Sequence, residues 1–247
     1  MSHTEPADGS LRLQAKLRAD RNTGEDGAPS SPFVVPDGAS APSHDRPTMF
    51  PDLTRDDVFR IETRRLWLRW PTARDAEAVS RLAGDPAVAE MTARIPSPLP
   101  LHEAEAFVIR SRAANTAGEG LIMALCRRAA PASLIGVVSV EHRPDEAEPH
   151  LGYWLGRPFW GEGLMTEAAE AMVDATFAYA GGRALASAAM VGNTGSRRVL
   201  EKCGFRLAGE SAPVFEARGG AVPSYTFRLD RAAWLDRRGT VAGGPAL

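Results

Sequence analysis

Residues 152–167 place two glycines, Gly161 and Gly163, between an apolar segment and a long amphipathic segment. The apolar segment predicts a strand and the amphipathic segment a helix, so the glycines belong to the loop that opens the helix. The first turn of a helix has backbone N–H groups without partners and carries the positive end of the helix dipole. Because a glycine has no side chain, a ligand can approach this backbone closely. The spacing therefore predicts a site for phosphate groups.

Glycine-rich loops occur in several kinds of protein, and the spacing separates them. A P-loop needs Gly-x-x-x-x-Gly-Lys-Ser/Thr, which does not occur in this chain. A dinucleotide-binding loop needs Gly-x-Gly-x-x-Gly, and Thr166 stands where the third glycine would be. For this loop taken alone, a turn without a ligand is the alternative.

A second motif follows the apolar segment 184–190. Asn193 precedes a predicted helix over 194–202 and can cap it, and Gly204 follows the end of that helix, where a glycine commonly stops one. Two strand–loop–helix motifs in this order are more specific than either motif alone.

Together the two motifs resemble the GNAT superfamily of acyl-CoA-dependent N-acetyltransferases, and within it the branch of ribosomal-protein alanine N-acetyltransferases. The resemblance covers roughly residues 59–235 and is carried by Gly152-Tyr-Trp-Leu, Arg157-Pro-Phe-Trp-Gly-Glu-Gly-Leu-Met-Thr-Glu-Ala168, Asn193-x-x-Ser196 and Leu200-Glu-Lys-Cys-Gly-Phe205. It implies an α/β domain of GNAT fold, with flanking helices and a mixed central sheet that is splayed between its fourth and fifth strands, here 150–155 and 184–190. In that fold the pantetheine arm of acetyl-CoA pairs with the strand edge exposed by the splay, much as a peptide adds to a sheet.

The resemblance also assigns residues to the cofactor, and it implies no metal. Leu155 would pair with the pantetheine arm through its backbone, Asn193 would reach the arm with its side chain, and Ser196 would lie near the sulfur. Backbone amides of the loop would hold the pyrophosphate, and this loop comprises Trp160, Gly161, Glu162, Gly163, Leu164 and Met165. Packing is the alternative role for Trp160, and helix capping alone is the alternative for Asn193.

The catalytic residues are less clear because the chain departs from its relatives. Many relatives have at position 200 a tyrosine whose hydroxyl protonates the leaving thiolate; Leu200 cannot do this, so Ser196 on the same predicted helix is the candidate donor. The nearer branch often has glutamate at position 150. We therefore predict His150 as the base that takes a proton from the attacking amine, with Glu141 as second and Glu148 as third candidate. The alternatives are a hydrogen-bonded strand residue for His150 and weak helix capping for Ser196.

The predicted elements alternate along the chain. Strands are expected at 65–70, 121–126, 133–140, 150–155, 184–190, 205–208 and 224–229, and helices at 72–83, 101–115, 161–179 and 194–202. Cys126 and Cys203 have no metal-ligand spacing and are predicted to be packing residues.

Composition divides the chain into three parts. Residues 1–48, rich in Pro, Gly, Ser, Asp and Ala, predict a flexible N-terminal extension, with a docking arm as the alternative. Residues 49–237 are the predicted GNAT acetyltransferase domain, and 238–247 a C-terminal tail. The chain start lacks the apolar core of a secretory signal and no apolar run could span a bilayer, so a cytoplasmic location without a membrane partner is expected. The 29 basic and 31 acidic residues, for a net charge of −2, argue against a general nucleic-acid-binding surface.

The chain is therefore interpreted as an N-acetyltransferase that moves an acetyl group from acetyl-CoA to a primary amine by direct transfer. The acceptor, a protein N-terminus or a small-molecule amine, is not identifiable from the sequence. Transfer of a longer acyl group and a non-catalytic acyl-CoA-binding module are the alternatives. A homodimer is compatible with the sequence.

Overall fold

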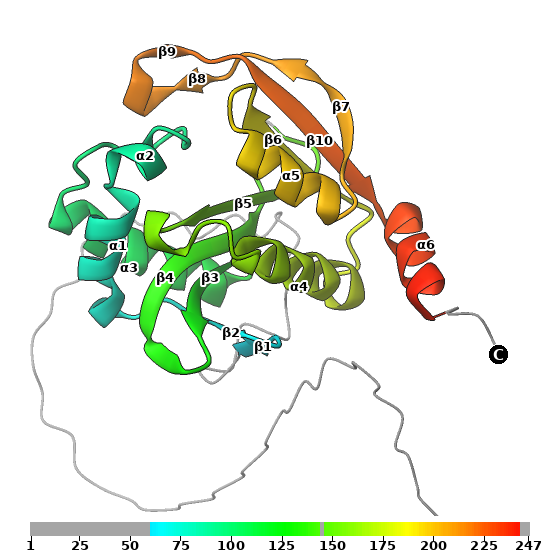
Figure 1. The fold of residues 1–247 in the computed structure, drawn as a ribbon, viewed down its shortest axis with the longest axis horizontal. Helices are drawn as coiled ribbons and strands as arrows, with labels where there is room; N and C mark the ends of the chain where they lie inside the picture. The colour runs from blue at the N-terminus through cyan, green and yellow to red at the C-terminus, as the bar shows by residue number, and fades with distance from the viewer. Residues whose placement is uncertain (1–59, 144–145, 243–247) are drawn as a thin grey trace, which may run out of the picture.

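The computed structural model describes residues 60–143 and 146–242, so the predicted extension 1–48 and the last five residues of the predicted tail lie outside the described residues. An eight-stranded mixed sheet forms the centre of this part of the chain (Figure 1). Its strand order is β1-β2-β3-β4-β5-β6-β10-β7. Neighbouring strands are antiparallel except for β5 and β6, which are parallel.

The strands of this sheet are β1 (Arg60–Glu62), β2 (Leu66–Arg69), β3 (Gly120–Arg127), β4 (Ala130–Glu141), β5 (His150–Leu155), β6 (Ala184–Met190), β7 (Arg206–Ser211) and β10 (Ser224–Asp230). A small hairpin pairs β8 (Val214–Phe215) with β9 (Gly220–Ala221). The helices are α1 (Ala76–Ala83), α2 (Pro86–Ala89), α3 (Leu101–Ala117), α4 (Leu164–Tyr179), α5 (Thr194–Lys202) and α6 (Arg231–Ala242). Short 3-10 turns are η1 (Ala73–Asp75), η2 (Arg157–Phe159) and η3 (Glu216–Arg218). Within the described residues, no helix combines the length and apolar character needed to cross a bilayer.

All predicted strands and helices are present, but two helix starts were predicted wrongly. The helix predicted over 72–83 is α1, which begins at Ala76 after the 3-10 turn η1. The prediction placed the other helix over 161–179, whereas α4 begins at Leu164. Gly161 and Gly163 have φ angles of 80° and 73°, in the left-handed region, which a right-handed helix excludes. At the other end of the chain, α6 was not predicted and continues to Ala242, into the predicted tail.

Helices cover both faces of the sheet (Figure 1). Helix α4 packs on one face, in a core cluster that includes Leu151 and Leu155 of β5, with Tyr153 packed against it. Helices α1 and α3 pack on the other face, where Trp154 joins the cluster. Because side chains alternate along a strand, β5 thus serves both layers, and His150 lies on the same face as Trp154.

A buried amide fixes the end of α3 to the sheet. Asn115 is fully buried; its Nδ2 donates to the carbonyl of Ile122 at 2.9 Å and its Oδ1 accepts from the Ile122 N–H at 2.7 Å. The side chain therefore satisfies both backbone groups of a buried strand residue, which would otherwise lack partners.

Candidate active site

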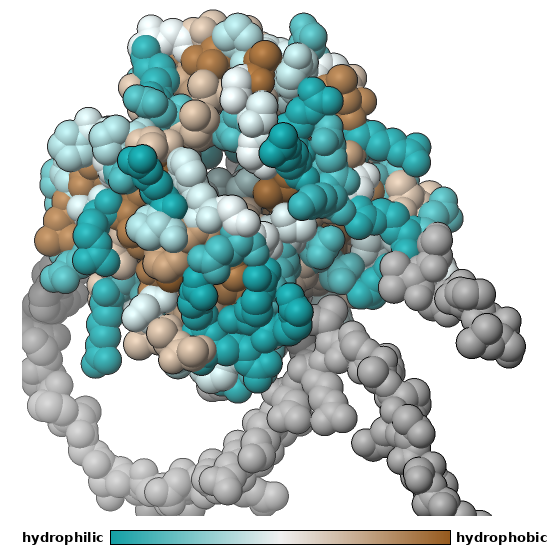
Figure 2. All heavy atoms as spheres, viewed as in Figure 1, coloured by the Kyte–Doolittle hydropathy of each residue, from teal (hydrophilic) through white to brown (hydrophobic). Residues whose placement is uncertain are grey.

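The two parallel strands at the centre of the sheet diverge from a single paired position. The register of β5 with β6 contains one pair, His150 with Ala186, and the Ala186 N–H donates to the carbonyl of Pro149 at 2.9 Å. The predicted splay between these strands is confirmed. Figure 2 shows that the molecular surface is hollowed near the centre of this view, with hydrophilic residues around much of the hollow.

The edge of β5 that faces the gap can be identified from its pairing with β4. The Gly156 N–H donates to the carbonyl of Ile135 at 2.9 Å, and Leu155 is opposite Gly136 in the register. Hydrogen-bonded and non-hydrogen-bonded pairs alternate in an antiparallel ladder. The backbone groups of Leu155, and of the residues two and four positions before it, therefore point away from β4 and toward the gap.

Two of these gap-facing carbonyls have partners. The Leu151 carbonyl accepts from the Ser187 hydroxyl at 2.8 Å, and the Leu155 carbonyl accepts from the indole Nε1 of Trp160 at 2.6 Å. Trp160 was predicted as a loop contact for the cofactor; the residue is 44 % exposed, and its indole N–H is bonded to the end of β5. Leu155 was predicted to contact the cofactor through its backbone. Its N–H faces the gap, whereas its carbonyl already accepts a hydrogen bond from Trp160.

The loop after β5 leads into the N-terminus of α4, where backbone N–H groups lack partners within the helix. The first helical backbone bond of α4 runs from the Glu167 N–H to the carbonyl of Gly163 at 3.2 Å, so the preceding amides have no partner within the helix. A Cβ atom built at Gly161 would meet no heavy atom within 4 Å, and one at Gly163 would meet only Arg65 Nη2, at 3.7 Å. The backbone at both glycines is therefore accessible to a ligand.

Two arginines lie beside this loop, and sequence reasoning missed both. Arg65 Nη1 donates to the carbonyl of Glu162 at 2.9 Å, and Arg127 Nη2 donates to both carboxylate oxygens of Glu162 at 2.7 Å. Arg127 is thus ion-paired with Glu162, and Arg65 is ion-paired with Glu167 at 2.6 Å, so the two guanidinium groups hold the loop in place while the helix N-terminus itself supplies the positive potential that suits an anionic ligand. Arg65 and Arg127 are distant from the loop in the sequence, so no local motif indicates them.

The start of α4 is also fixed by Glu167. Its Oε1 accepts from the Thr63 hydroxyl at 2.6 Å and from the Arg65 N–H at 2.7 Å, and its Oε2 accepts from Arg65 Nε at 2.6 Å. Burial acts to raise the pKa of Glu167, but the hydrogen bonds from Thr63 and Arg65 outweigh it and hold that pKa below its ordinary value. The carboxylate is therefore charged and ties the segment between β1 and β2 to the helix.

His150 lies at the paired end of the gap and is 6 % exposed. Its Nδ1 is 2.7 Å from Glu146 Oε2. Burial, together with the positive charges of Arg143 and Arg94, lowers the pKa of His150 to about 4, despite the opposing effect of Glu146. The imidazole is therefore neutral near pH 7; with the Nδ1 proton donated to Glu146, the lone pair is on Nε2. Glu146 precedes β5 by a few residues and was not predicted.

The other two candidate bases differ in their surroundings. Glu141 is directly opposite His150 in the β4–β5 register. Glu148 forms an ion pair with Arg228, at 2.8 Å, so its carboxylate is already paired with a cation. Of the two, Glu141 is the one placed beside His150.

The second motif surrounds the start of α5. Asn193 caps this helix as predicted, because its Oδ1 accepts from the Ser196 N–H at 2.9 Å. The hydroxyl of Tyr153 is 3.1 Å from the Ser196 carbonyl, to which it can donate, and 3.0 Å from Ser196 Oγ. Leu200 is fully buried in the core. The partner of the Ser196 hydroxyl is thus Tyr153 on strand β5, a contact that sequence reasoning missed.

Comparison with known proteins agrees with this geometry. Residues 65–206 match the family model described as an acetyltransferase (GNAT) domain. The chain belongs to the GNAT acetyltransferase family. A curated relative named "Putative ribosomal N-acetyltransferase YdaF", from Bacillus subtilis strain 168, is 33% identical over 81 residues, which are 32% of this chain and 44% of that relative.

Solved structures share the fold of this acetyltransferase. Ribosomal-protein-S5-alanine acetyltransferase from Vibrio fischeri has a TM-score of 0.60 and 17% identity, covering 71% of this chain and 98% of that chain. RimL, a ribosomal L7/L12 alpha-N-protein acetyltransferase in complex with coenzyme A, has a TM-score of 0.61 and 19% identity, covering 71% of this chain and 99% of that chain. At these identities the likeness concerns the fold.

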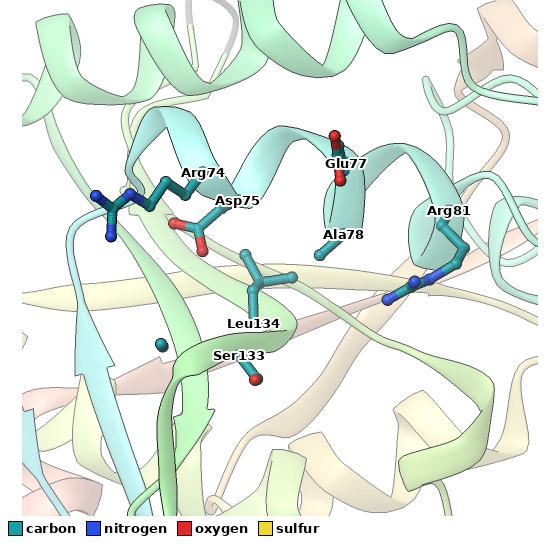
Figure 3. A pocket seen from close by; sticks show the side chains of 8 residues that line it. Arg74, Asp75, Glu77, Ala78, Arg81, Ser133 and Leu134 are labelled. Atoms are coloured by element: carbon teal, nitrogen blue, oxygen red, sulfur yellow. The ribbon is translucent and has the colours of Figure 1, made fainter.

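A separate depression lies elsewhere on the acetyltransferase, between α1 and β4 (Figure 3). Its volume is about 200 Å³, and the residues that line it include Arg74, Asp75 and Arg81 on the helical side and Ser133 and Leu134 on β4. None of the predicted site residues lines it. The two cysteines have no part in the site either. Both are free and buried, and burial raises their thiol pKa values, to about 11 for Cys126 and about 12 for Cys203.

Proposed function

We propose that this enzyme transfers the acetyl group of acetyl-CoA directly to a primary amine, and that its preferred acceptor is the α-amino group of a protein N-terminus. The observation that carries the proposal is the gap between β5 and β6, which opens beyond one paired position and has the glycine loop at its other end. A gap of this shape can accept an extended amide-containing arm along the exposed edge of β5.

The cofactor is placed by three groups of residues. The pyrophosphate binds the amides of the loop from Trp160 to Met165, which Arg65 and Arg127 hold in place through their bonds to Glu162. The pantetheine arm runs along the gap-facing backbone of β5, toward the Leu155 N–H and the backbone of Tyr153. Asn193 uses Oδ1 for its cap, so only its Nδ2 is left to donate to the arm.

The chemistry follows from the neutral state of His150. The amine nitrogen attacks the thioester carbon, the C–S bond breaks with its electron pair on sulfur, and the amine proton passes to His150 Nε2, directly or through a water. With a pKa of about 4, His150 cannot deprotonate an ammonium group appreciably before attack; it accepts the proton once the new C–N bond has made the nitrogen acidic. Glu146 on Nδ1 stabilises the imidazolium that forms.

This weak base favours acceptors that are partly neutral at pH 7. An α-amine has a pKa near ~7.7–8 and a lysine near ~10.4, so the neutral fraction of the α-amine is several hundredfold larger. The names of YdaF, RimL and the S5-alanine acetyltransferase also refer to ribosomal N-acetylation or to acetylation of ribosomal proteins. Both considerations support a protein N-terminus as the acceptor.

The test is a screen of CoA release with matched peptides. One set has free N-termini and no lysine, the second set has blocked N-termini and one lysine, and a third set contains small amines, each offered with acetyl-CoA or with a longer acyl-CoA. We expect turnover with acetyl-CoA and the free N-termini. Turnover confined to the blocked lysine peptides or to small amines would reject the proposed acceptor, and CoA binding without turnover on any set would favour a binding module.

A further inference from the structure

The guanidinium group of Arg65 connects the first turn of α4 with the middle of the glycine loop. Its Nε donates to Glu167 Oε2 at 2.6 Å, and its Nη1 donates to the carbonyl of Glu162 at 2.9 Å. The Arg65 backbone N–H also donates to Glu167, at 2.7 Å, so the residue is fixed by its main chain as well as by its side chain. A Cβ atom built at Gly163 would lie 3.7 Å from Arg65 Nη2, which places the guanidinium beside the peptide that joins Glu162 to Gly163.

The bond to the Glu162 carbonyl also determines where the Gly163 N–H points. A peptide group is planar and trans, so its carbonyl oxygen and its N–H point in opposite directions. Because Arg65 holds the oxygen, the Gly163 N–H is directed away from Arg65. In the described part of the chain, the N–H groups of Gly163, Leu164 and Met165 all lack a hydrogen-bond acceptor. The loop therefore presents unpaired donors to a ligand, and Arg65 fixes the direction of the first of them.

Gly163 alone would not keep this orientation. Turning the peptide over changes ψ of Glu162 and φ of Gly163, and glycine adopts positive and negative φ about equally readily. With the Arg65 bond in place, the φ of Gly163 is 73°. In the reversed peptide the Glu162 carbonyl oxygen would point where the N–H points now, and its partial negative charge would repel an anion. The donor on this carbonyl therefore decides whether the loop offers a hydrogen bond to a phosphate or opposes it.

We propose that Arg65 is a positioning residue for the pyrophosphate of the cofactor, because it keeps the Glu162 carbonyl turned away from the phosphate and the Gly163 N–H turned toward it. The inference rests on the proposed function, since it requires the pyrophosphate to lie at this loop. Arg65 acts through the orientation of the peptide rather than through its charge, which is paired with Glu167. Its replacement should therefore weaken binding of the phosphate end of the cofactor and leave binding of the pantetheine end as before.

Arg127 provides a matched control at the same loop residue. It donates to the carboxylate of Glu162 rather than to the carbonyl, at 2.7 Å, and the two side chains of this ion pair are 42 % and 41 % exposed. Replacing Arg127 removes one positive charge from the loop, as replacing Arg65 does, but it leaves the bond between Arg65 and the carbonyl in place. Because exposed ion pairs are weak, Arg127 should contribute less to the backbone geometry than Arg65.

The test separates the phosphate end of CoA from the pantetheine end. Calorimetry measures the affinity for CoA, and competition with CoA measures the affinities for 3′-phospho-ADP, which has the pyrophosphate but no pantetheine, and for pantetheine, which has no phosphate. The proteins are the wild type, Arg65→Lys, Arg127→Met and the double variant Arg65→Met with Glu167→Gln. Lysine keeps the charge at position 65, but its single ammonium group does not reproduce the fork that contacts Glu167 and Glu162 together. The double variant removes the carboxylate that Arg65→Met alone would leave without its cation.

Arg65→Lys and the double variant should each bind CoA and 3′-phospho-ADP about 10- to 150-fold more weakly than the wild type, which is the range for one hydrogen bond to a charged group. Their affinity for pantetheine should be unchanged, which shows that the gap is folded. Arg127→Met should lose about fivefold or less in CoA affinity.

Three results would overturn the inference and leave the proposed function intact, because the wild type binds CoA in each of them. Wild-type CoA affinity in Arg65→Lys would show that a positive charge suffices at position 65. A loss in Arg127→Met as large as that in Arg65→Lys would show that the carbonyl bond has no particular importance. An equal loss for pantetheine would mean that Arg65 supports the whole domain rather than the loop. Absence of CoA binding to the wild type would reject the proposed function and the inference with it.

Discussion

Substitutions at Gly163 can distinguish an effect on ligand binding from an effect of backbone strain, because Gly181 has a similar backbone conformation and serves as a control. Gly163 has a φ of 73° at the start of α4, and Gly181 has a φ of 64° just beyond its end; a Cβ atom at either position meets no protein atom closer than 3.7 Å. Alanine at either site should therefore cost stability only through the left-handed backbone, about 1–2 kcal/mol. For a domain of this size that corresponds to a fall in Tm of roughly 2–8 °C, the same for Gly163→Ala and Gly181→Ala.

The cofactor should distinguish the two sites, most clearly with Gly163→Asp. Aspartate tolerates the left-handed region, but its carboxylate would lie about 5 Å from the proposed pyrophosphate, where one like-charge pair costs about 1–3 kcal/mol between the water and protein-surface limits. CoA affinity should fall roughly 5- to 150-fold. Gly181→Asp should bind CoA like the wild type.

The assay is calorimetry with CoA at about 50 mM and about 500 mM salt, since screening weakens the charge repulsion at the higher concentration. The loss in Gly163→Asp should be smaller at high salt. If Gly163→Asp binds CoA as tightly as the wild type, or if Gly181→Asp loses as much affinity, the placement of the pyrophosphate at this loop is wrong.

Four further predictions follow, two for His150 and one each for the chain start and Asn115. The pKa of His150 is 6.5 in the unfolded chain and about 4 in the folded chain, so between these pH values the unfolded state binds more protons and the free energy of unfolding falls as the pH falls. From pH 7 to pH 5 the loss is about 2 kcal/mol. Denaturant unfolding of His150→Gln should lack that part of the pH dependence. His150→Ala should lower turnover by ~10²–10⁴, and the wild-type pH–rate curve should lack the acidic limb near pH 6–7 that an exposed histidine would give; an unchanged rate in His150→Ala would move the base to Glu141 or to water. A chain that begins at Met49 should fold and bind CoA like the full chain, and loss of CoA binding would mean that residues 1–48 dock onto the domain. Asn115→Leu leaves two buried backbone groups of Ile122 without partners and should reduce the free energy of unfolding by about 2–5 kcal/mol, whereas Ser111→Ala, on the same helix, should change it by less than about 1 kcal/mol.

The sequence predicted the fold because its signals are local. Apolar periodicity, Asn193 as a cap and Gly204 as a stop act within a few residues, and the structure confirms each of them. The start of α4 was misplaced because the amphipathic pattern does not reveal the backbone angles of Gly161 and Gly163.

The parts of the site that were missed depend on contacts between distant segments. Arg65, just before β2, and Arg127, at the end of β3, reach the loop, and Tyr153 contacts Ser196 across the gap. Glu146 is close to His150 in the sequence, but several acidic residues surround that position, and only the folded loop selects the one that contacts Nδ1. The low pKa of His150 likewise depends on burial, which no single position in the sequence indicates.

The contacts of Glu167 have a consequence for the smallest chain that can form this enzyme. Thr63 and Arg65 lie far before the glycine motif in the sequence, yet they donate hydrogen bonds to the Glu167 carboxylate in the first turn of α4. A shortened chain that starts after Thr63 would still contain every residue of the two motifs, but it would leave a charged, partly buried Glu167 with fewer donors. The functional unit of the enzyme therefore begins well before its recognisable motifs, at the short segment between β1 and β2.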